Sequence, residues 1–197
     1  MQHLIGVFLI IVSGISFGAA AIFARLAYEA GTTPMTLLFL RFGIASVCML
    51  LILLVRGIPL PRGRILLILV LMGAVGYVGQ SFCYFTALTL VSAGLVALLL
   101  YLYPALVTIL AVIIQKEPIS KWKIIALMFA LVGTALTIGP AEGGKPLGII
   151  LSLGAAFIYS FYILVGSKIT KQGTAIQSST VIITSAAVVY LSLIHIS

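Results

Sequence analysis

The fold of this chain is decided by one long uncharged stretch, which runs from Ile65 to Gln115 and reads ILLILVLMGAVGYVGQSFCYFTALTLVSAGLVALLLYLYPALVTILAVIIQ. It is about twice the length that a helix needs to cross roughly 30 Å of hydrocarbon. Apolar segments of this length cross bilayers as helices because a helix satisfies its own backbone hydrogen bonds. The stretch must therefore turn back once, and we expect the turn in its most polar part, Thr89 to Gly94.

The composition extends this reading to the whole chain. With 63% hydrophobic and 7% charged residues, there is too little polar surface to cover a water-soluble globule. A membrane β-barrel would instead show alternating segments of about ten residues. The sequence therefore predicts an all-α integral membrane protein, a helical bundle whose expected spans are Leu4 to Ala24, Met35 to Val55, Ile65 to Leu88, Ala93 to Ile114, Ile124 to Gly139, Leu147 to Ser167 and Ala175 to Ile194.

The charged residues predict an orientation. Two basic residues, Arg25 and Lys145, and the acidic Glu29 and Glu142 lie in or beside loops on one side of the expected spans. Because basic loops stay in the cytoplasm, we expect a multi-pass protein of the plasma or inner membrane with its amino terminus cytoplasmic. The net charge of +8 is explained in the same way, and no nucleic-acid partner is expected. The basic residues on the amino-terminal side are Arg56, Arg62, Arg64, Lys116, Lys121, Lys123, Lys168 and Lys171.

The chain also repeats itself weakly at a spacing of about 140 residues, with Gly6 opposite Gly148 and Phe17 opposite Tyr159. Five spans separate the two copies, so the second copy must enter the membrane upside down. Inverted repeats of this kind are typical of secondary transporters. We therefore predict a first repeat of five helices over residues 1–140 and two helices of a second over residues 141–197.

Several motifs resemble a known family. Arg41-Phe42, the segment from Tyr84 to Leu88, the segment from Leu98 to Pro104, and Glu117 with Ser120 are similar to the EamA domain of the drug/metabolite transporter superfamily. The resemblance implies ten helices in two inverted five-helix repeats and movement of small metabolites across a membrane. Lys116 stands where the family usually has a glycine.

The second predicted repeat stops after two of the five helices that the resemblance implies. We interpret the chain as an incomplete copy of a longer transporter. The alternatives are a seven-helix protein in its own right and a chain completed by oligomerisation.

A polar stripe runs along the third expected span. Tyr77, Gln80, Ser81 and Tyr84 follow one another at i, i+3, i+4 and i+7, which places them on one helical face. In a bilayer, such a stripe faces other helices or water. It either bonds neighbouring helices together or lines a cavity, and the same residues can do both.

Arg41 is the one basic residue that the pattern places inside a span. It lies about six residues from the outer end, at a depth of about 9 Å. Its long side chain either snorkels to the interface or faces a cavity, where its donors would suit an anionic or carboxylate-bearing substrate. The family resemblance favours the cavity.

Pro104 is expected to kink the fourth span because it cannot donate to the carbonyl of Leu100. Tyr101 and Tyr103 lie beside this kink, and broken helices line the substrate path in transporters. Tyr159 and Tyr162, in the sixth span, either face the same cavity or belong to the core. On the first span, Gly14 and Gly18 predict close packing against another helix of the chain.

Nothing in the sequence points to catalysis. His3 and His195 are isolated, Cys48 and Cys83 have no metal-ligand spacing, and no aspartate occurs. We expect no catalytic residue, metal or cofactor, and the partners expected are a small metabolite or drug and the lipid bilayer. The function predicted is secondary transport of small metabolites by alternating access; the alternatives are a structural or assembly subunit and a membrane enzyme acting on lipid-linked substrates.

Overall fold

The computed structural model describes residues 2–116, 120–138, 145–169 and 174–196. Glu117, Glu142 and Lys171, and the predicted boundary between residues 140 and 141, lie outside the described residues. The described part of the chain is built from helices and short connections. In chain order these are α1 (Gln2–Glu29), α2 (Pro34–Val55), α3 (Arg64–Leu71), the π-helix η1 (Met72–Tyr77), α4 (Val78–Ala87), α5 (Ala93–Leu100), α6 (Tyr103–Gln115), α7 (Lys121–Ile138), α8 (Pro146–Ile169) and α9 (Ala175–Ile196).

The helices agree with the expected spans, and the prediction of an integral membrane helical bundle is confirmed. The fifth expected span corresponds to α7. Within the described residues, six segments are long and apolar enough to cross a membrane: Gly6–Glu29, Pro34–Val55, Arg64–Ala87, Ala93–Ile114, Pro146–Ile169 and Ala175–His195.

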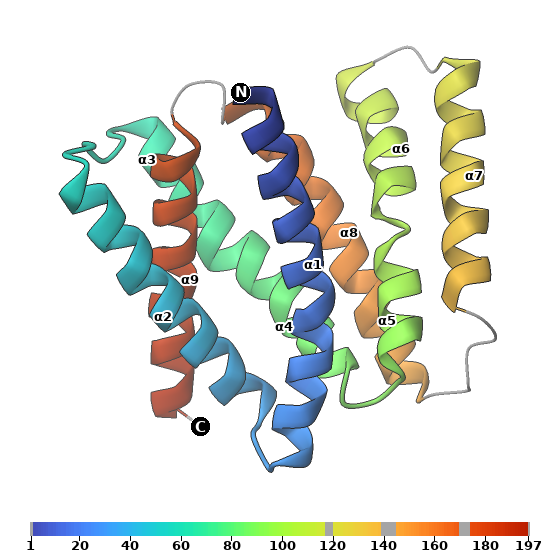
Figure 1. The fold of residues 1–197 in the computed structure, drawn as a ribbon, viewed down its shortest axis with the longest axis horizontal. Helices are drawn as coiled ribbons and strands as arrows, with labels where there is room; N and C mark the ends of the chain where they lie inside the picture. Colours follow the sequence, from blue (N-terminus) through green and yellow to red (C-terminus); the bar gives the residue numbers. More distant parts are fainter. Residues whose placement is uncertain (1, 117–119, 139–144, 170–173, 197) are drawn as a thin grey trace.

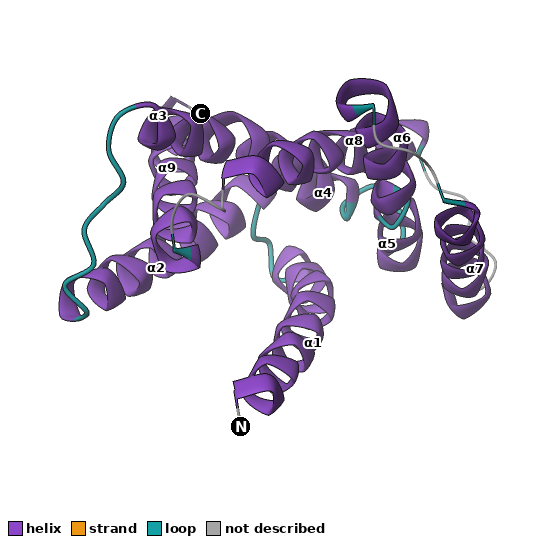
Figure 2. Ribbon diagram, turned by 90° about the horizontal axis from the view of Figure 1, so that it is seen from above, coloured by secondary structure: helices purple, strands orange, loops and turns teal. Residues whose placement is uncertain are grey.

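Successive spans alternate in direction, and the two termini lie at opposite ends of the bundle (Figure 1). Helix α2 packs along α9, while α8 packs along both α4 and α6. Seen from above, α1 stands apart from the layer that the other helices form (Figure 2). Helix α1 meets the rest of the bundle through its second half, where Ala21 and Ala24 are buried.

The turns begin and end where the sequence supplies caps. Helix α4 ends at Ala87 and α5 starts at Ala93, which confirms a turn in the middle of the long uncharged stretch. Ser92 caps α5 by accepting a hydrogen bond from the Leu95 amide at 3.3 Å. Thr33 caps α2 in the same way, and Pro34 follows at the first helical position, where its missing N–H costs nothing.

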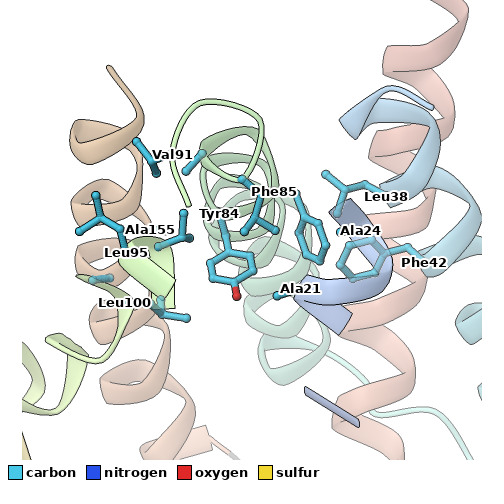
Figure 3. Packing of buried hydrophobic residues seen from close by; sticks show 14 of the residues in the cluster. Ala21, Ala24, Leu38, Phe42, Tyr84, Phe85, Val91, Leu95, Leu100 and Ala155 are labelled. Atoms are coloured by element: carbon cyan, nitrogen blue, oxygen red, sulfur yellow. The ribbon is translucent and has the colours of Figure 1, made fainter. Parts of the chain in front are cut away.

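The core gathers around α4 and combines aromatic with small side chains (Figure 3). Phe42, Tyr84 and Phe85 are buried beside Ala24 and Ala155, which are fully buried. Lipid tails are as apolar as these side chains, so close packing of small residues, rather than burial from water, holds such helices together.

Two close helix contacts are made at glycines, and one of these, Gly73, extends the polar stripe of the third span, where the sequence predicts that glycines allow close approach. A Cβ on Gly73 would collide with the Ile182 carbonyl oxygen and lie 2.9 Å from the Ile182 Cα. A Cβ on Gly148 would lie 2.7 Å from the Val91 side chain. Gly14 and Gly18 have nothing within 4 Å of such a Cβ, so the expectation of close packing there is wrong.

The third span is not a continuous α-helix, because the six residues of η1 form a π-helical turn in its middle. Gly73 lies in this turn, where its missing side chain lets the backbone lie against α9. A π turn carries an extra residue and shifts the angular position of everything after it, and such turns are frequent at functional sites. The turn therefore sets the direction in which Tyr77 and the α4 residues project.

Candidate functional site

Residues from four spans surround a narrow cavity of about 40 Å³ beside η1 and α4. This volume holds about one water molecule. Of the predicted site residues, five line it, and none of the lining residues is acidic. The lining consists of Phe17, Ala20, Arg41, Tyr77, Gln80, Ser81, Tyr84, Phe85 and Tyr159.

Arg41, on α2, brings the positive charge of the cavity. Its guanidinium carbon lies 5.0 Å from the centroid of the Phe85 ring and 5.7 Å from that of Phe42. Ring faces attract a cation, most strongly where water is excluded. Tyr28 donates a hydrogen bond to the Phe85 carbonyl at 3.0 Å and so ties α1 to this part of α4. The guanidinium is thus oriented by aromatic rings, while the described residues that line the cavity include no carboxylate to neutralise it.

The polar stripe of the third span divides into two roles. Gln80 and Tyr84 are buried in the bundle and face the cavity. Ser81 also borders the cavity, but its hydroxyl is hydrogen-bonded to the Tyr77 carbonyl at 2.6 Å and to the Tyr190 hydroxyl at 2.8 Å. Helix bonding and cavity lining, the two alternatives for the stripe, therefore both occur, and Ser81 does both.

A row of aromatic rings connects four spans along one side of the cavity. Tyr77 meets Phe42 edge to face at 5.2 Å and stacks on Tyr162 at 5.6 Å. Tyr159 stacks on Tyr162 at 6.0 Å and meets Tyr103 edge to face at 4.9 Å. Such offset and edge-to-face pairs are the geometries that aromatic rings prefer. The row gives the cavity a stiff apolar wall next to the charge of Arg41.

The fourth span is broken near Pro104. Helix α5 ends at Leu100 and α6 begins at Tyr103, with Pro104 in its first turn. Between them the Leu102 amide donates to the Leu99 carbonyl at 3.3 Å, so the chain tightens before the helix restarts. Ser160 of α8 donates to the Tyr103 carbonyl at 3.2 Å. This bond joins the first turn of α6 to the helix that carries Tyr159.

The remaining predicted tyrosines lie differently. Tyr103 does not line the cavity itself but packs against Tyr159, which does. Tyr101 is 45% exposed, and it is not among the lining residues. The structure therefore brings Arg41, Tyr77, Gln80, Tyr84 and Tyr159 together, places Tyr103 and Tyr162 behind them, and leaves Tyr101 outside.

Phe17, Ala20 and Phe85 line the cavity although the sequence did not indicate them as site residues. Two of them carried a usable signal. Phe85 belongs to the motif from Tyr84 to Leu88, and Phe17 is the residue opposite Tyr159 in the internal repeat. Ala20 follows Phe17 at i+3 on α1 and has no distinguishing chemistry.

Three comparisons with known proteins bear on identity. Residues 4–139 match the EamA-like transporter family. An uncharacterized transporter of Bacillus subtilis (strain 168), YyaM, is 30% identical over 189 residues, which cover 91% of this chain and 61% of that relative. A protein of known crystal structure superposes with a TM-score of 0.68 at 24% identity, over 91% of this chain and 66% of that one, and shares the fold. This chain thus spans less than two thirds of the length of either protein.

The family match covers α1 to α7 and includes the motifs around Arg41, Tyr84 and Pro104. Together with the apolar helices, it makes the chain a multi-pass membrane protein of transporter type. The resemblance found from the sequence motifs is therefore confirmed, and the chain belongs to the EamA-like transporter family.

Proposed function

We propose that this chain forms the substrate site of a secondary transporter that moves small metabolites by alternating access. The observation that carries the proposal is the cavity in which Arg41, Gln80 and Tyr84 converge behind an aromatic wall. Intramembrane charged residues are costly, and those that face a cavity mark substrate or ion pathways. Membership of a transporter family favours this function over an enzyme that acts on lipid-linked substrates.

The chemistry of the wall favours a substrate that carries a carboxylate. Arg41 offers a planar fork of donors, which matches a carboxylate in a bidentate pair. Gln80 supplies an amide beside it, and the lining residues include no acidic group that would compete for the guanidinium. A cationic substrate would have to enter next to an uncompensated positive charge.

The internal repeat supports transport by two inverted halves. Phe17 and Tyr159, which the repeat places opposite one another, both line the cavity, one from α1 and one from α8. These two helices run in opposite directions (Figure 1). Substrate sites of inverted-repeat transporters lie between the repeats. We propose that residues 1–140 and 141–197 belong to two such repeats, the second represented by two helices.

The cavity is closed in this structure, since about 40 Å³ is too small for a metabolite. Substrate entry therefore requires the walls to separate. Helix α1 contributes Phe17 and Ala20 to one wall and stands apart from the layer of the other helices (Figure 2). We propose that the cavity opens when α1 moves relative to α4. We also propose that the amino terminus lies on the cytoplasmic side of the cell membrane.

The test is uptake by the product of the complete reading frame that encodes these residues, purified and reconstituted in phospholipid vesicles. The panel consists of radiolabelled amino acids, nucleosides, monocarboxylates and cationic drugs, with protein-free vesicles as the control. Saturable uptake of a carboxylate-bearing compound that Arg41→Gln weakens supports the proposal. If every compound equilibrates as slowly as in protein-free vesicles, transport is refuted.

A structural or assembly subunit is separated from a transporter by the same variants. Substitution of Arg41 or Gln80 should abolish or weaken uptake while the amount of protein in the membrane stays the same. Loss of the protein itself from the membrane would indicate that these residues serve packing.

A further inference from the structure

Tyr190 is a fully buried residue of α9 that lies behind the cavity without lining it. Its ring stacks on that of Phe42 at 5.3 Å with an interplanar angle of 16°. Phe42 is the neighbour of Arg41 and carries one of the two ring faces under the guanidinium. Tyr190 therefore supports the α2 wall of the cavity from the side opposite the substrate.

The hydroxyl of Tyr190 reaches the other wall. It lies 2.8 Å from the Ser81 hydroxyl and 3.0 Å from the Val78 carbonyl oxygen. Ser81 has a single proton and lies 2.6 Å from the Tyr77 carbonyl oxygen, the shortest of its contacts. With that proton donated to Tyr77, the single proton of Tyr190 is shared between the Ser81 oxygen and the Val78 carbonyl oxygen, so a hydrogen-bond network joins Tyr190 and Ser81 to the backbone of Tyr77 and Val78.

These hydrogen bonds reach Tyr77, the last residue of the π-helical turn. Helix α9 makes a second contact near the start of the turn, where Gly73 touches its backbone at Ile182. Helix α9 thus holds η1 at both ends. Each residue of a helix turns it by about 100°, so gain or loss of the extra residue would swing Gln80 and Tyr84 by about that angle.

We infer that Tyr190 is a positioning residue for substrate, which sets the register of the π-helical turn and thereby aims Tyr77 and Gln80 into the cavity. The effect on substrate binding rests on the proposed transport function. The positioning of Tyr77 and Gln80 by Tyr190 does not depend on it. It assigns to α9, in the predicted second repeat, control over residues that belong to the first.

The positioning of residue 80 is tested without a substrate by thiol labelling of Gln80→Cys. The variant is made in a cysteine-free background that carries Cys48→Ala and Cys83→Ala. The probe is 2-sulfonatoethyl methanethiosulfonate, a hydrophilic reagent, applied to the purified protein. Tyr190→Phe keeps the ring that stacks on Phe42 and removes only the hydroxyl. We expect it to slow labelling of residue 80 about fivefold, the factor that corresponds to loss of one hydrogen bond.

Two further variants keep the test decisive. Thr180→Val removes another fully buried hydroxyl of α9, one that bonds to the Ile176 carbonyl of its own helix, and it should leave labelling unchanged. Ser81→Ala removes one of the two acceptors of the Tyr190 hydroxyl and leaves the Val78 carbonyl, so it should slow labelling by less than Tyr190→Phe does, and the double variant should equal Tyr190→Phe. Equal labelling in wild type and Tyr190→Phe, or effects of the two variants that add, would overturn the inference.

Transport supplies the second readout. For whichever carboxylate-bearing compound of the panel the wild type carries, Tyr190→Phe should raise KM about fivefold and leave Vmax within about twofold, because the site is misplaced while the conformational cycle is intact. A fall in Vmax at constant KM would contradict a positioning role. If no compound is carried but labelling responds as expected, the transport proposal fails and the positioning of Gln80 by Tyr190 stands.

Discussion

Phe17 of α1 and Tyr159 of α8 line the same cavity, although they are 142 positions apart along the chain. They are also the aromatic pair that the weak internal repeat places opposite one another. Phe17 approaches Tyr84 at 6.4 Å between ring centroids, and Tyr159 approaches Tyr103 at 4.9 Å. The two rings that the predicted repeat pairs thus lie in one cavity, which is the arrangement expected for a site between inverted halves.

Replacement of Arg41 should weaken transport of a carboxylate-bearing substrate. Arg41→Gln removes a charge-assisted bond, and KM for uptake into vesicles should rise at least about tenfold. Arg41→Lys keeps the charge but loses the planar fork and the favourable stacking on Phe85, so an intermediate KM is expected. Immunoblots of the membrane fraction control for protein amount. An unchanged KM in Arg41→Gln would show that the guanidinium does not contact substrate.

The electrostatic field that Arg41 produces in the cavity should also be measurable without a substrate. In the cysteine-free background, we expect Gln80→Cys to react at least about threefold faster with the anionic 2-sulfonatoethyl methanethiosulfonate than with the cationic 2-(trimethylammonium)ethyl reagent. Both rates are normalised to those of a free thiol. Addition of Arg41→Gln should abolish the preference. A preference that persists would assign the field to other basic residues.

Gly73 should be intolerant of any side chain. The Cβ of Gly73→Ala would meet the backbone of α9 at Ile182, where neither helix has a flexible side chain to move aside. We expect a loss of about 1–3 kcal/mol in the free energy of unfolding, measured by titration with sodium dodecyl sulfate. Gly14→Ala is the matched control, because a Cβ on Gly14 would have nothing within 4 Å. Its effect on the free energy of unfolding should stay within about 0.5 kcal/mol. Equal effects of the two variants would refute the close contact.

The predicted orientation can be read from single cysteines in exposed loops. Thr89, between α4 and α5, should face the exterior, while Leu60, between α2 and α3, should face the cytoplasm; both are exposed. In intact cells and the cysteine-free background, an impermeant maleimide should label Thr89→Cys and spare Leu60→Cys. Both should react after the cells are opened. The reverse pattern would place the amino terminus outside.

Much of the fold followed from features that act locally. Apolar length predicted the spans from Gly6–Glu29 to Ala175–His195, because a helix in lipid must satisfy its own backbone. The spacing of Tyr77, Gln80 and Tyr84 predicted a shared polar face, and all three residues line the cavity. Tyr101 and Tyr103 do not line it, because their places beside a helix break gave no direction for their side chains.

The sequence by itself determined the membrane class, the helices and the residues with unusual chemistry, since length, polarity and charge act residue by residue. Only the tertiary structure decided which glycine touches a neighbouring helix, that a π-helical turn lies at Met72–Tyr77, and that Tyr190 contacts Ser81 across 109 positions. In lipid, apolar helices gain little from contact as such, so their partners are chosen by shape and by a few hydrogen bonds. Shape complementarity and these hydrogen bonds depend on the fit between surfaces that are far apart in the sequence.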